Sequence, residues 1–316
     1  MYRFWIIALL VTMYILAHSS VLNFHQKPVS MIEKKLADEP VVQTPDSQQY
    51  IAPDSFINLT KLFQLSTNDL RHLFNDSIIK NGNYKQRIEY YSELGLETPY
   101  VLSSLGEGPL GLYDKDPLLD LTRVDCMTFC EQILALSISP NYDEFFRILQ
   151  KIRYTGDVVN IIKRNHFVIA DWLPDNQWLL EDLTQKIGGN SCKRMTKTIH
   201  RRLFIRTLGV KDSLNDVPGP DTLSQPYIPK EVMPEIKSQL KNGDIVCLAT
   251  HRKGIFVSHM GFFIIKPDQE IYFRNASSSS QKVIDEPYSE LYNRLLKKKS
   301  AAGIIIFRVR TNFALK

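Results

Sequence analysis

The sequence predicts an α+β fold, in which mainly helical segments come first and a strand-rich segment ends the chain. Two observations support this class. Apolar residues recur at helical spacing between residues 126 and 134, and short runs rich in valine, isoleucine and phenylalanine alternate with turn residues between 243 and 309. With 316 residues, of which 44% are hydrophobic, the chain has enough apolar material for a substantial core.

The first 55 residues are interpreted as a leader and a linker. Arg3 precedes an apolar run over residues 4–17, which is shorter than the roughly 20 residues that a membrane-spanning helix needs. Small residues in Ala17-His18-Ser19 predict a signal peptide over residues 1–19, with a retained membrane anchor as the alternative. The polar, proline-containing residues 20–55 predict a linker. We therefore expect an exported protein, periplasmic or extracellular.

Residues 56–140 are predicted to form a helical part. Leucines at helical spacing predict one helix from Asn58 to Lys80, and a second helix from Tyr84 is expected to stop at Gly95. A loop rich in glycine and proline follows, up to residue 120.

Cys126 opens the next predicted helix. Apolar residues follow it at positions i+3, i+4, i+7 and i+8, which predicts one buried face. Asp125 or Thr122 is the expected N-cap. Because free amides and the dipole at a helix N-terminus favour negative charge, we expect this position to favour the thiolate of Cys126.

Residues 141–240 are interpreted as a mixed insertion that walls a substrate groove. They contain the loop from Arg164 to Trp172 and a predicted basic amphipathic helix from Lys193 to Leu208, ended by Gly209. The basic face could meet an acidic glycopeptide or make weak contact with a membrane surface, although such charge runs are more often simply solvated.

Residues 241–316 are predicted to form an antiparallel β part, with strands at Ile245–Leu248, Ile255–Ile265, Ile271–Ala276 and Ile304–Val309. If a five-residue loop at 265–269 or 266–270 joins the second and third strands, His259 and Asn275 point to the same face. A four-residue loop would place them on opposite faces.

The spacing of these residues is compatible with a thiol hydrolase. A cysteine nucleophile needs a base within reach and usually a third group that orients the base. Cys126, His259 and Asn275 fit these three roles. The alternative is that Cys126 is a small buried residue and His259 a core histidine with a satisfied ring.

Composition and motif spacing narrow the partners and cofactors that we expect. The 39 basic and 34 acidic side chains give a formal charge of +5, too mild an excess to indicate nucleic acid as a partner. Zinc-binding spacings and phosphate-binding glycine loops are missing from the sequence, so we expect neither a metal nor another cofactor. One disulfide among Cys130, Cys192 and Cys247 remains open, because spacing cannot choose a pair.

Several separated motifs together resemble one family. They are Thr98-Pro99-Tyr100, Val124-Asp125-Cys126-Met127-Thr128-Phe129, Arg164-Asn165-His166-Phe167 with Asp171-Trp172, Gly243-Asp244-Ile245-Val246, Ser258-His259-Met260-Gly261-Phe262, and Asn275-Ala276-Ser277-Ser278. Their order is similar to that of the DUF1460 family, which is N-acetylmuramoyl-L-alanine amidase-like and a branch of the papain-like NlpC/P60 cysteine hydrolases. The resemblance implies Cys126 as nucleophile, His259 as base and Asn275 as the third polar residue, a position that is often histidine in the wider superfamily.

The resemblance also implies residues that bind substrate, namely Tyr100, Arg153, Arg164, His166 and Asp171. An arginine could hold a stem-peptide carboxylate in bidentate fashion, with Asp171 supporting it. The alternatives are a loop tyrosine packed on the core and a buried polar network that holds the insertion in place.

The implied reaction is hydrolysis of an amide in peptidoglycan or its muropeptide fragments, between the lactyl group of N-acetylmuramic acid and L-alanine. One alternative is an endopeptidase that cuts the stem peptide between D-glutamate and a diamino acid. Another is a non-catalytic cell-wall binding or effector protein on a hydrolase scaffold. The sequence leaves the oligomeric state open.

Overall fold

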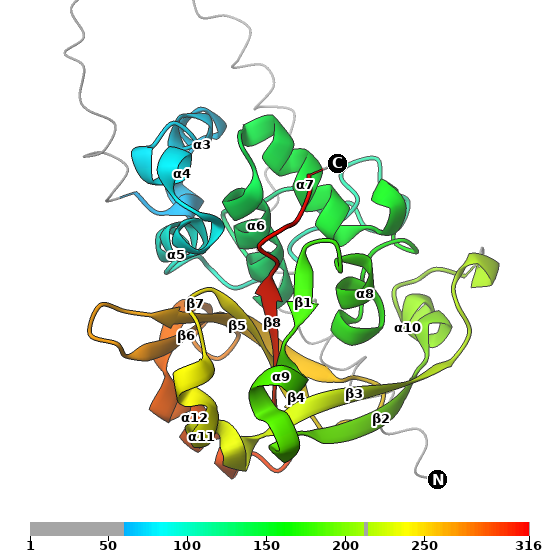
Figure 1. Ribbon diagram of the computed structural model, residues 1–316. Coiled ribbons are helices and arrows are strands. Elements are labelled where there is room, and N and C mark those ends of the chain that lie inside the picture. Colours follow the sequence, from blue (N-terminus) through cyan, green and yellow to red (C-terminus); the bar gives the residue numbers. More distant parts are fainter. Residues whose placement is uncertain (1–59, 212–213, 316) are drawn as a thin grey trace, which may run out of the picture. The chain divides into compact units, whose positions relative to one another are not determined.

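In the computed structural model, which describes residues 60–211 and 214–315, an eight-stranded antiparallel sheet organises the fold (Figure 1). Its main path runs β2-β3-β8-β4-β5-β6-β7, and β1 pairs with the far end of β8. The strands are β1 (Leu180–Asp182), β2 (Lys193–Ile199), β3 (Asp221–Pro229), β4 (Asp244–Thr250), β5 (Val257–Ile265), β6 (Ile271–Ser277), β7 (Lys282–Pro287) and β8 (Ala301–Val309).

Helices cover both faces of this sheet (Figure 1). One buried cluster joins one face to α5 (Tyr84–Leu94), α6 (Cys126–Ile138) and α7 (Tyr142–Arg153). A second cluster joins the opposite face to α9 (Thr184–Gly188), α11 (Met233–Ile236) and α12 (Tyr288–Lys297). The α+β prediction is therefore confirmed, whereas the papain-like relationship stays a prediction.

Shorter segments connect these layers. The remaining α-helices are α3 (Thr67–Leu73), α4 (Ser77–Asn81), α8 (Leu173–Asp175) and α10 (Arg201–Thr207). A π-helical turn spans Val168–Trp172, and 3-10 turns lie at Leu62–Gln64, Thr155–Asp157, Gly189–Ser191, Leu214–Asp216, Lys230–Val232 and Lys237–Gln239.

Helix α6 begins at Cys126, as predicted, and Asp125 rather than Thr122 is its N-cap. The Asp125 Oδ1 accepts from the amides of Met127, at 3.0 Å, and Thr128, at 2.8 Å. Thr128 Oγ1 accepts in return from the Asp125 amide at 2.8 Å, which completes a capping box. These bonds fix the helix start, and hence the backbone of Cys126.

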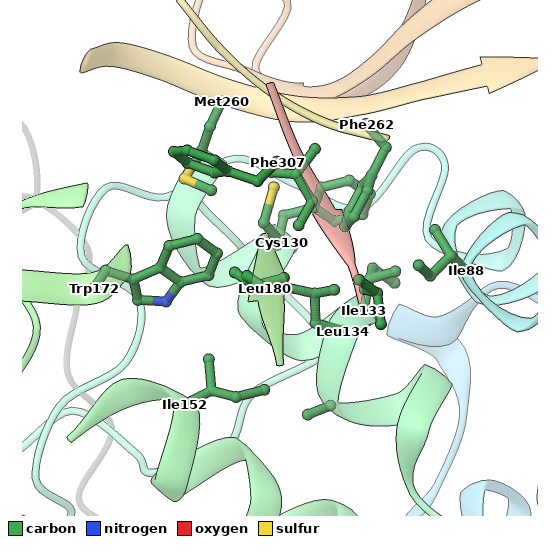
Figure 2. Close-up of a cluster of buried hydrophobic side chains, with 14 of the residues drawn as sticks. Ile88, Cys130, Ile133, Leu134, Ile152, Trp172, Leu180, Met260, Phe262 and Phe307 are labelled. Carbon is green, nitrogen blue, oxygen red and sulfur yellow. The ribbon is translucent and has the colours of Figure 1, made fainter. Parts of the chain in front are cut away.

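The rest of α6 is buried against the sheet. Figure 2 shows Cys130, Ile133 and Leu134 in the same cluster as Phe262 of β5 and Phe307 of β8. The Phe129 and Phe262 rings meet edge to face, with centroids 6.0 Å apart. This packing explains why α6 is apolar along most of its length, and it holds the helix N-terminus close to β5.

The four strands predicted in the C-terminal part are present, with ends shifted by a few residues. Strand β7 and helix α12 were not predicted from the sequence. The strand is short and carries three charged residues, and α12 starts directly after Pro287 without a side-chain cap. Their signals are therefore weak, and it is burial of Tyr288, Leu291 and Leu295 against the sheet that favours α12.

The predicted continuous helix from Asn58 to Lys80 is wrong within the described residues. A 3-10 turn is followed by α3 and then by α4. Ser66 starts α3 afresh, because its Oγ accepts from the Asp69 amide at 3.2 Å while the Asp69 carboxylate accepts from the Ser66 amide at 3.0 Å.

The predicted basic helix from Lys193 to Leu208 is also wrong in its first half. Residues Lys193–Ile199 form β2, which pairs antiparallel with β3, and only Arg201–Thr207 is helical. Met195 and Ile199 are buried on this strand, and its two threonines favour extended structure. Gly209 follows the helix with φ +92°, as expected of a residue that ends a helix.

The stretch 141–240 contributes directly to the central sheet, because β1 and β3 both pair with β8. The domain boundaries that the sequence suggested remain predictions. The signal peptide at 1–19 and the linker at 20–55 lie outside the described residues. Within the described ranges, every helix is too short or too polar to cross a membrane.

Candidate active site

A hydrogen bond joins His259, near the start of β5, to Asn275, near the end of β6. Ile265 pairs with Ile271, so the hairpin loop is the five-residue segment 266–270 that places both side chains on one face. His259 Nε2 and Asn275 Oδ1 are 2.8 Å apart. Asn275 Nδ2 donates to the Phe273 carbonyl at 3.0 Å, which orients the amide so that its oxygen faces the ring. With the Asn275 oxygen facing the ring, the hydrogen-bond pattern assigns the proton to His259 Nε2 and leaves Nδ1 as the acceptor.

The ladder between β5 and β6 ends before it reaches these two residues. Its last pair is Phe262 with Arg274, and at the start of β5 a register shift against β4 falls beside His259. Bulges of this kind locally twist a strand and redirect its side chains. The Met260 amide, which follows His259, lies near the sulphur of Cys126 and lowers the pKa of the thiol. The thiol thus lies where β5 and β6 have separated.

Cys126 is half-buried, and its thiol is neutral at neutral pH. Burial raises the pKa of Cys126 to about 12, and the adjacent Asp125 carboxylate raises it further, against the amides of Met260, Cys126 and Met127 that lower it. The amides at the helix N-terminus act in the expected direction. Burial of the thiol and the negative charge of Asp125 raise the pKa of Cys126 by more than the nearby amides lower it.

The pKa of His259 is shifted in the opposite direction to that of Cys126. Burial lowers the pKa of its imidazole below the ordinary 6.5, although the hydrogen bond to Asn275 opposes the shift. At neutral pH the ring is therefore uncharged and able to accept a proton. Among the described residues, no hydrogen bond joins the Cys126 sulphur to this ring.

Gly261 permits the close approach of β6. A Cβ added there would overlap the Arg274 carbonyl oxygen and lie 2.9 Å from the Asn275 Cβ. We expect Gly261→Ala to push Asn275 away and to lower the free energy of unfolding by about 1–3 kcal/mol. Turnover should fall by more than the loss of folded protein explains. Thermal unfolding and a turnover assay on the same preparation check this. Gly219→Ala is the matched control, because nothing lies within 4 Å of the added Cβ; equal behaviour of both variants would contradict the expectation.

Tyr100 lies close to the nucleophile. Its backbone forms a bridge with Val124, and its amide donates to the Gln281 carbonyl at 2.9 Å. Burial raises the pKa of the tyrosine, and proximity to Cys126 and Asp125 raises it further. The phenol therefore stays protonated and can donate a hydrogen bond, and its role in substrate binding stays a prediction.

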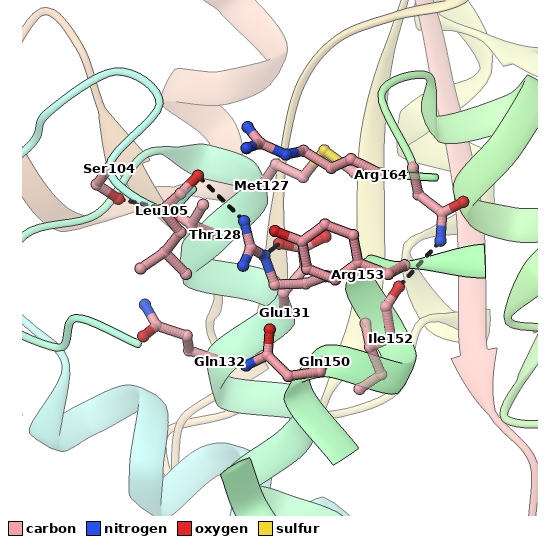
Figure 3. A network of polar contacts seen from close by, with 12 residues as sticks. Ser104, Leu105, Met127, Thr128, Glu131, Gln132, Gln150, Ile152, Arg153 and Arg164 are labelled. Atoms are coloured by element: carbon pink, nitrogen blue, oxygen red, sulfur yellow. Dashed lines mark hydrogen bonds and ion pairs between the residues drawn. The ribbon is translucent and has the colours of Figure 1, made fainter. Parts of the chain in front are cut away.

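Arg153 is not available to a substrate in this structure. It is 2% exposed, its Nη2 donates to the Leu105 carbonyl at 3.1 Å, and its Nε pairs with Glu131 of α6 at 3.3 Å (Figure 3). Burial raises the pKa of Glu131 to about 7, although Arg153 opposes the shift. The geometry favours the alternative reading, in which Arg153 fastens the loop after Tyr100 to helix α6.

We expect Arg153→Met to destabilise the fold by about 3–5 kcal/mol, because it leaves Glu131 buried without its partner. The double variant Arg153→Met/Glu131→Leu removes both charges and should recover most of that loss. Chemical denaturation measures both. Arg147→Met, which breaks the exposed pair with Glu144, is the control and should cost at most about 1 kcal/mol. A loss no larger than this for Arg153→Met would contradict the assignment.

Arg164, His166 and Asp171 line a cavity of 470 Å³, which Tyr100, Arg153, Cys126 and His259 do not line. Arg164 pairs with Glu107, and with Asp114 at 2.7 Å. Asp171 supports a different arginine, Arg201, whose Nε lies 2.6 Å from its Oδ1. Arg164 also lies in the polar network around Arg153 and Glu131 (Figure 3), and the substrate-binding roles of these residues stay predictions.

A hydrogen bond fixes the orientation of His166 in this cavity. Its Nε2 lies 2.7 Å from the Ile161 carbonyl oxygen, so that nitrogen donates. Burial lowers the pKa of His166 to about 4, and the nearby Arg164 lowers it further. The ring is neutral, and it packs edge to face on Phe204.

Sequence reasoning missed several residues that shape the site. The partners of the two arginines, Glu107, Asp114 and Glu131, were not singled out, and Arg201 was noted only as one basic residue of the predicted amphipathic helix. Only Glu131 had a detectable signal, because an acidic residue in an otherwise apolar helix indicates a buried partner. The Met260 amide could not be predicted from residue type, since every non-proline residue carries one.

The comparisons with known proteins agree with the motifs. Residues 90–301 match the AmiA-like family, described as N-acetylmuramoyl-L-alanine amidase-like. The chain belongs to this family. The match covers Cys126, His259 and Asn275, and it confirms the resemblance found in the sequence. A search of curated proteins finds no match.

Solved structures related to the amidase-like family share the fold. A Legionella pneumophila protein of DUF1460 is 25% identical, with a TM-score of 0.70 over 77% of this chain and 93% of that one. An N-acetylmuramoyl-L-alanine amidase from Bacteroides uniformis is 23% identical, with a TM-score of 0.59 over 72% and 99% of the two chains. A candidate xylanase from Bacteroides fragilis is 29% identical, with a TM-score of 0.56 over 69% and 99%.

Proposed function

We propose that this protein is a cysteine-dependent amidase that cleaves the bond between N-acetylmuramic acid and L-alanine in peptidoglycan or its fragments. The observation that carries the proposal is the oriented imidazole of His259, held through Nε2 by Asn275, directly before the amide that lies near the Cys126 sulphur. Membership of the amidase-like family supports the substrate class.

The proposed reaction has two steps. The Cys126 sulphur attacks the lactyl carbonyl carbon while His259 Nδ1 accepts the thiol proton. The carbon–nitrogen bond then breaks, the imidazolium returns the proton to the amine of L-alanine, and a thioester remains on Cys126. Water attacks the thioester, His259 again accepts and returns the proton, and the free carboxylate of the muramic acid leaves. Asn275 holds the productive tautomer throughout.

The pH dependence of kcat/KM follows from the two shifted groups. We expect kcat/KM to fall as pH drops through the pKa of His259, below 6.5, because the protonated ring cannot accept the thiol proton. From pH 6.5 to 8.5 it should stay flat, because the pKa of Cys126 lies near 12. Initial rates from pH 4 to 9 measure this. A tenfold rise per pH unit between 7 and 9 would instead indicate that a free thiolate attacks.

A substrate pair tests which bond is cut. The first substrate is a disaccharide carrying a stem peptide, and the second is the same stem peptide without the sugars. The proposed amidase releases the complete stem peptide from the first and leaves the second intact. The alternative endopeptidase cuts inside the stem in both, between D-glutamate and the diamino acid. A scaffold that only binds the cell wall would cut neither.

We also propose that the mature protein acts outside the cytoplasm, after loss of residues 1–19. The short apolar run at 4–17 and the small residues that follow support this. The N-terminal residue of the protein recovered from a periplasmic or secreted fraction tests the proposal. A start near residue 20 is expected, whereas an intact Met1 in the membrane fraction would favour the anchor.

A further inference from the structure

The loop between β4 and β5, residues 251–256, leads directly into the strand that carries His259. One side of this loop is fastened to the segment before β8, because the His251 amide donates to the Ser300 carbonyl at 2.8 Å. The Thr250 amide closes the loop by donating to the Phe256 carbonyl at 3.0 Å. These bonds fix the two ends, and the carbonyls between them need another partner.

Lys197, in the middle of β2, supplies that partner. Its Nζ lies 2.5 Å from each of three carbonyl oxygens, those of Thr250, Arg252 and Ile255. An ammonium group has three protons, so the contacts use all of its donors. The same nitrogen lies 5.7 Å from the centre of the Phe256 ring. Burial lowers the pKa of Lys197 to about 8, which agrees with a poorly hydrated ammonium held by carbonyls.

We propose that Lys197 is a positioning residue that holds the loop 251–256, and through it the irregular start of β5, so that His259 faces Cys126. The proposal rests on the proposed function of His259 as the base. Two of the three bonds reach carbonyls within residues 251–256 and the third reaches Thr250 at the end of β4; His259 lies two residues after Val257. Next to His259 the β4–β5 register is shifted, so the regular ladder alone does not determine its place.

The chain contains a matched lysine for comparison. Lys230 Nζ also donates to three backbone carbonyls, those of Leu295, Leu296 and Lys298, at 3.1, 3.4 and 3.2 Å. It fastens the end of α12 rather than the loop before His259. Lys230→Met therefore removes the same kind of contact at a different place.

The test compares wild type, Lys197→Met and Lys230→Met in two assays. The first measures kcat and KM on the disaccharide–peptide. The second measures the rate at which iodoacetamide alkylates Cys126 at pH 7, read by peptide mass spectrometry, and needs no substrate. We expect Lys197→Met to lower kcat and the alkylation rate on the order of tenfold, with KM within about twofold. Lys230→Met should leave both unchanged.

Two results would overturn the proposal: Lys197→Met matching wild type in both assays, or losing turnover while Cys126 is alkylated at the wild-type rate. If Lys197→Met does not fold, Lys197→Arg replaces it. Its planar guanidinium keeps the charge but cannot converge on three carbonyls, so alkylation should slow, and a wild-type rate would again refute the clamp. If wild type turns over no muropeptide, the proposed function fails, and the alkylation comparison still decides the role of Lys197.

Discussion

Cys126→Ala is expected to abolish hydrolysis of a disaccharide–peptide, with a loss of at least about 10³-fold in kcat. The sulphur atom is the nucleophile of the first step in the proposed reaction, and nothing in the shortened side chain can form the thioester. Because Cys126 is half-buried and the helix start is held by Asp125, the substitution should change the free energy of unfolding by no more than about 1 kcal/mol. Product formation and thermal unfolding are measured on the same samples.

Cys192→Ala is the control for this variant. Cys192 is also half-buried and free, and its sulphur donates to the Thr184 carbonyl at 3.3 Å, on the side of the sheet covered by α9. It should keep wild-type turnover. Retained hydrolysis in Cys126→Ala would show that another group attacks the amide, and the cysteine-dependent mechanism would be wrong.

His259→Gln is expected to lower kcat by about 10²–10⁴-fold, because the neutral thiol then lacks a base. Asn275→Ala should have a smaller effect, on the order of tenfold to a hundredfold. In Asn275→Ala the imidazole of His259 can still accept a proton, but it loses the oxygen that accepts from Nε2–H. A fraction of the enzyme molecules therefore carries the unproductive tautomer. Steady-state kinetics on both variants measure these losses.

The order of these two effects is itself a test. In the double variant His259→Gln/Asn275→Ala, the loss should be no larger than for His259→Gln alone, because Asn275 acts through the imidazole. Fully multiplicative losses would mean that Asn275 contributes separately, for example by touching substrate. Unchanged kcat in His259→Gln would remove His259 from the mechanism.

The helix start at Cys126 and the placement of His259 beside Asn275 could be predicted from the sequence because their signals are local. Cys126 starts a helix with a strict apolar periodicity, and a hairpin with a five-residue loop determines the side on which His259 and Asn275 lie. Two-residue periodicity carries this information over short distances. The sequence could not predict where β5 and β6 separate, although that separation exposes the Met260 amide to the thiol.

The surroundings of the centre depend on contacts between distant segments. Lys197 was assigned to a solvated helix because its neighbours are basic, yet it lies on a strand and reaches carbonyls more than fifty residues away. Arg153 was expected at the substrate, but Glu131 on the next helix pairs with it in the interior. In both cases the sequence shows the charged side chain but not the groups that it contacts. The same limit applies to the pKa of Cys126, because burial raises it by more than the amides of the helix N-terminus lower it.

The most direct test of the central claim is mass spectrometry of a defined disaccharide–peptide incubated with the mature protein and, in parallel, with Cys126→Ala. Our account predicts free stem peptide that begins at L-alanine, together with the intact disaccharide acid, in the first sample and neither product in the second. Equal amounts of these products in both samples, or cleavage only inside the stem peptide, would contradict it.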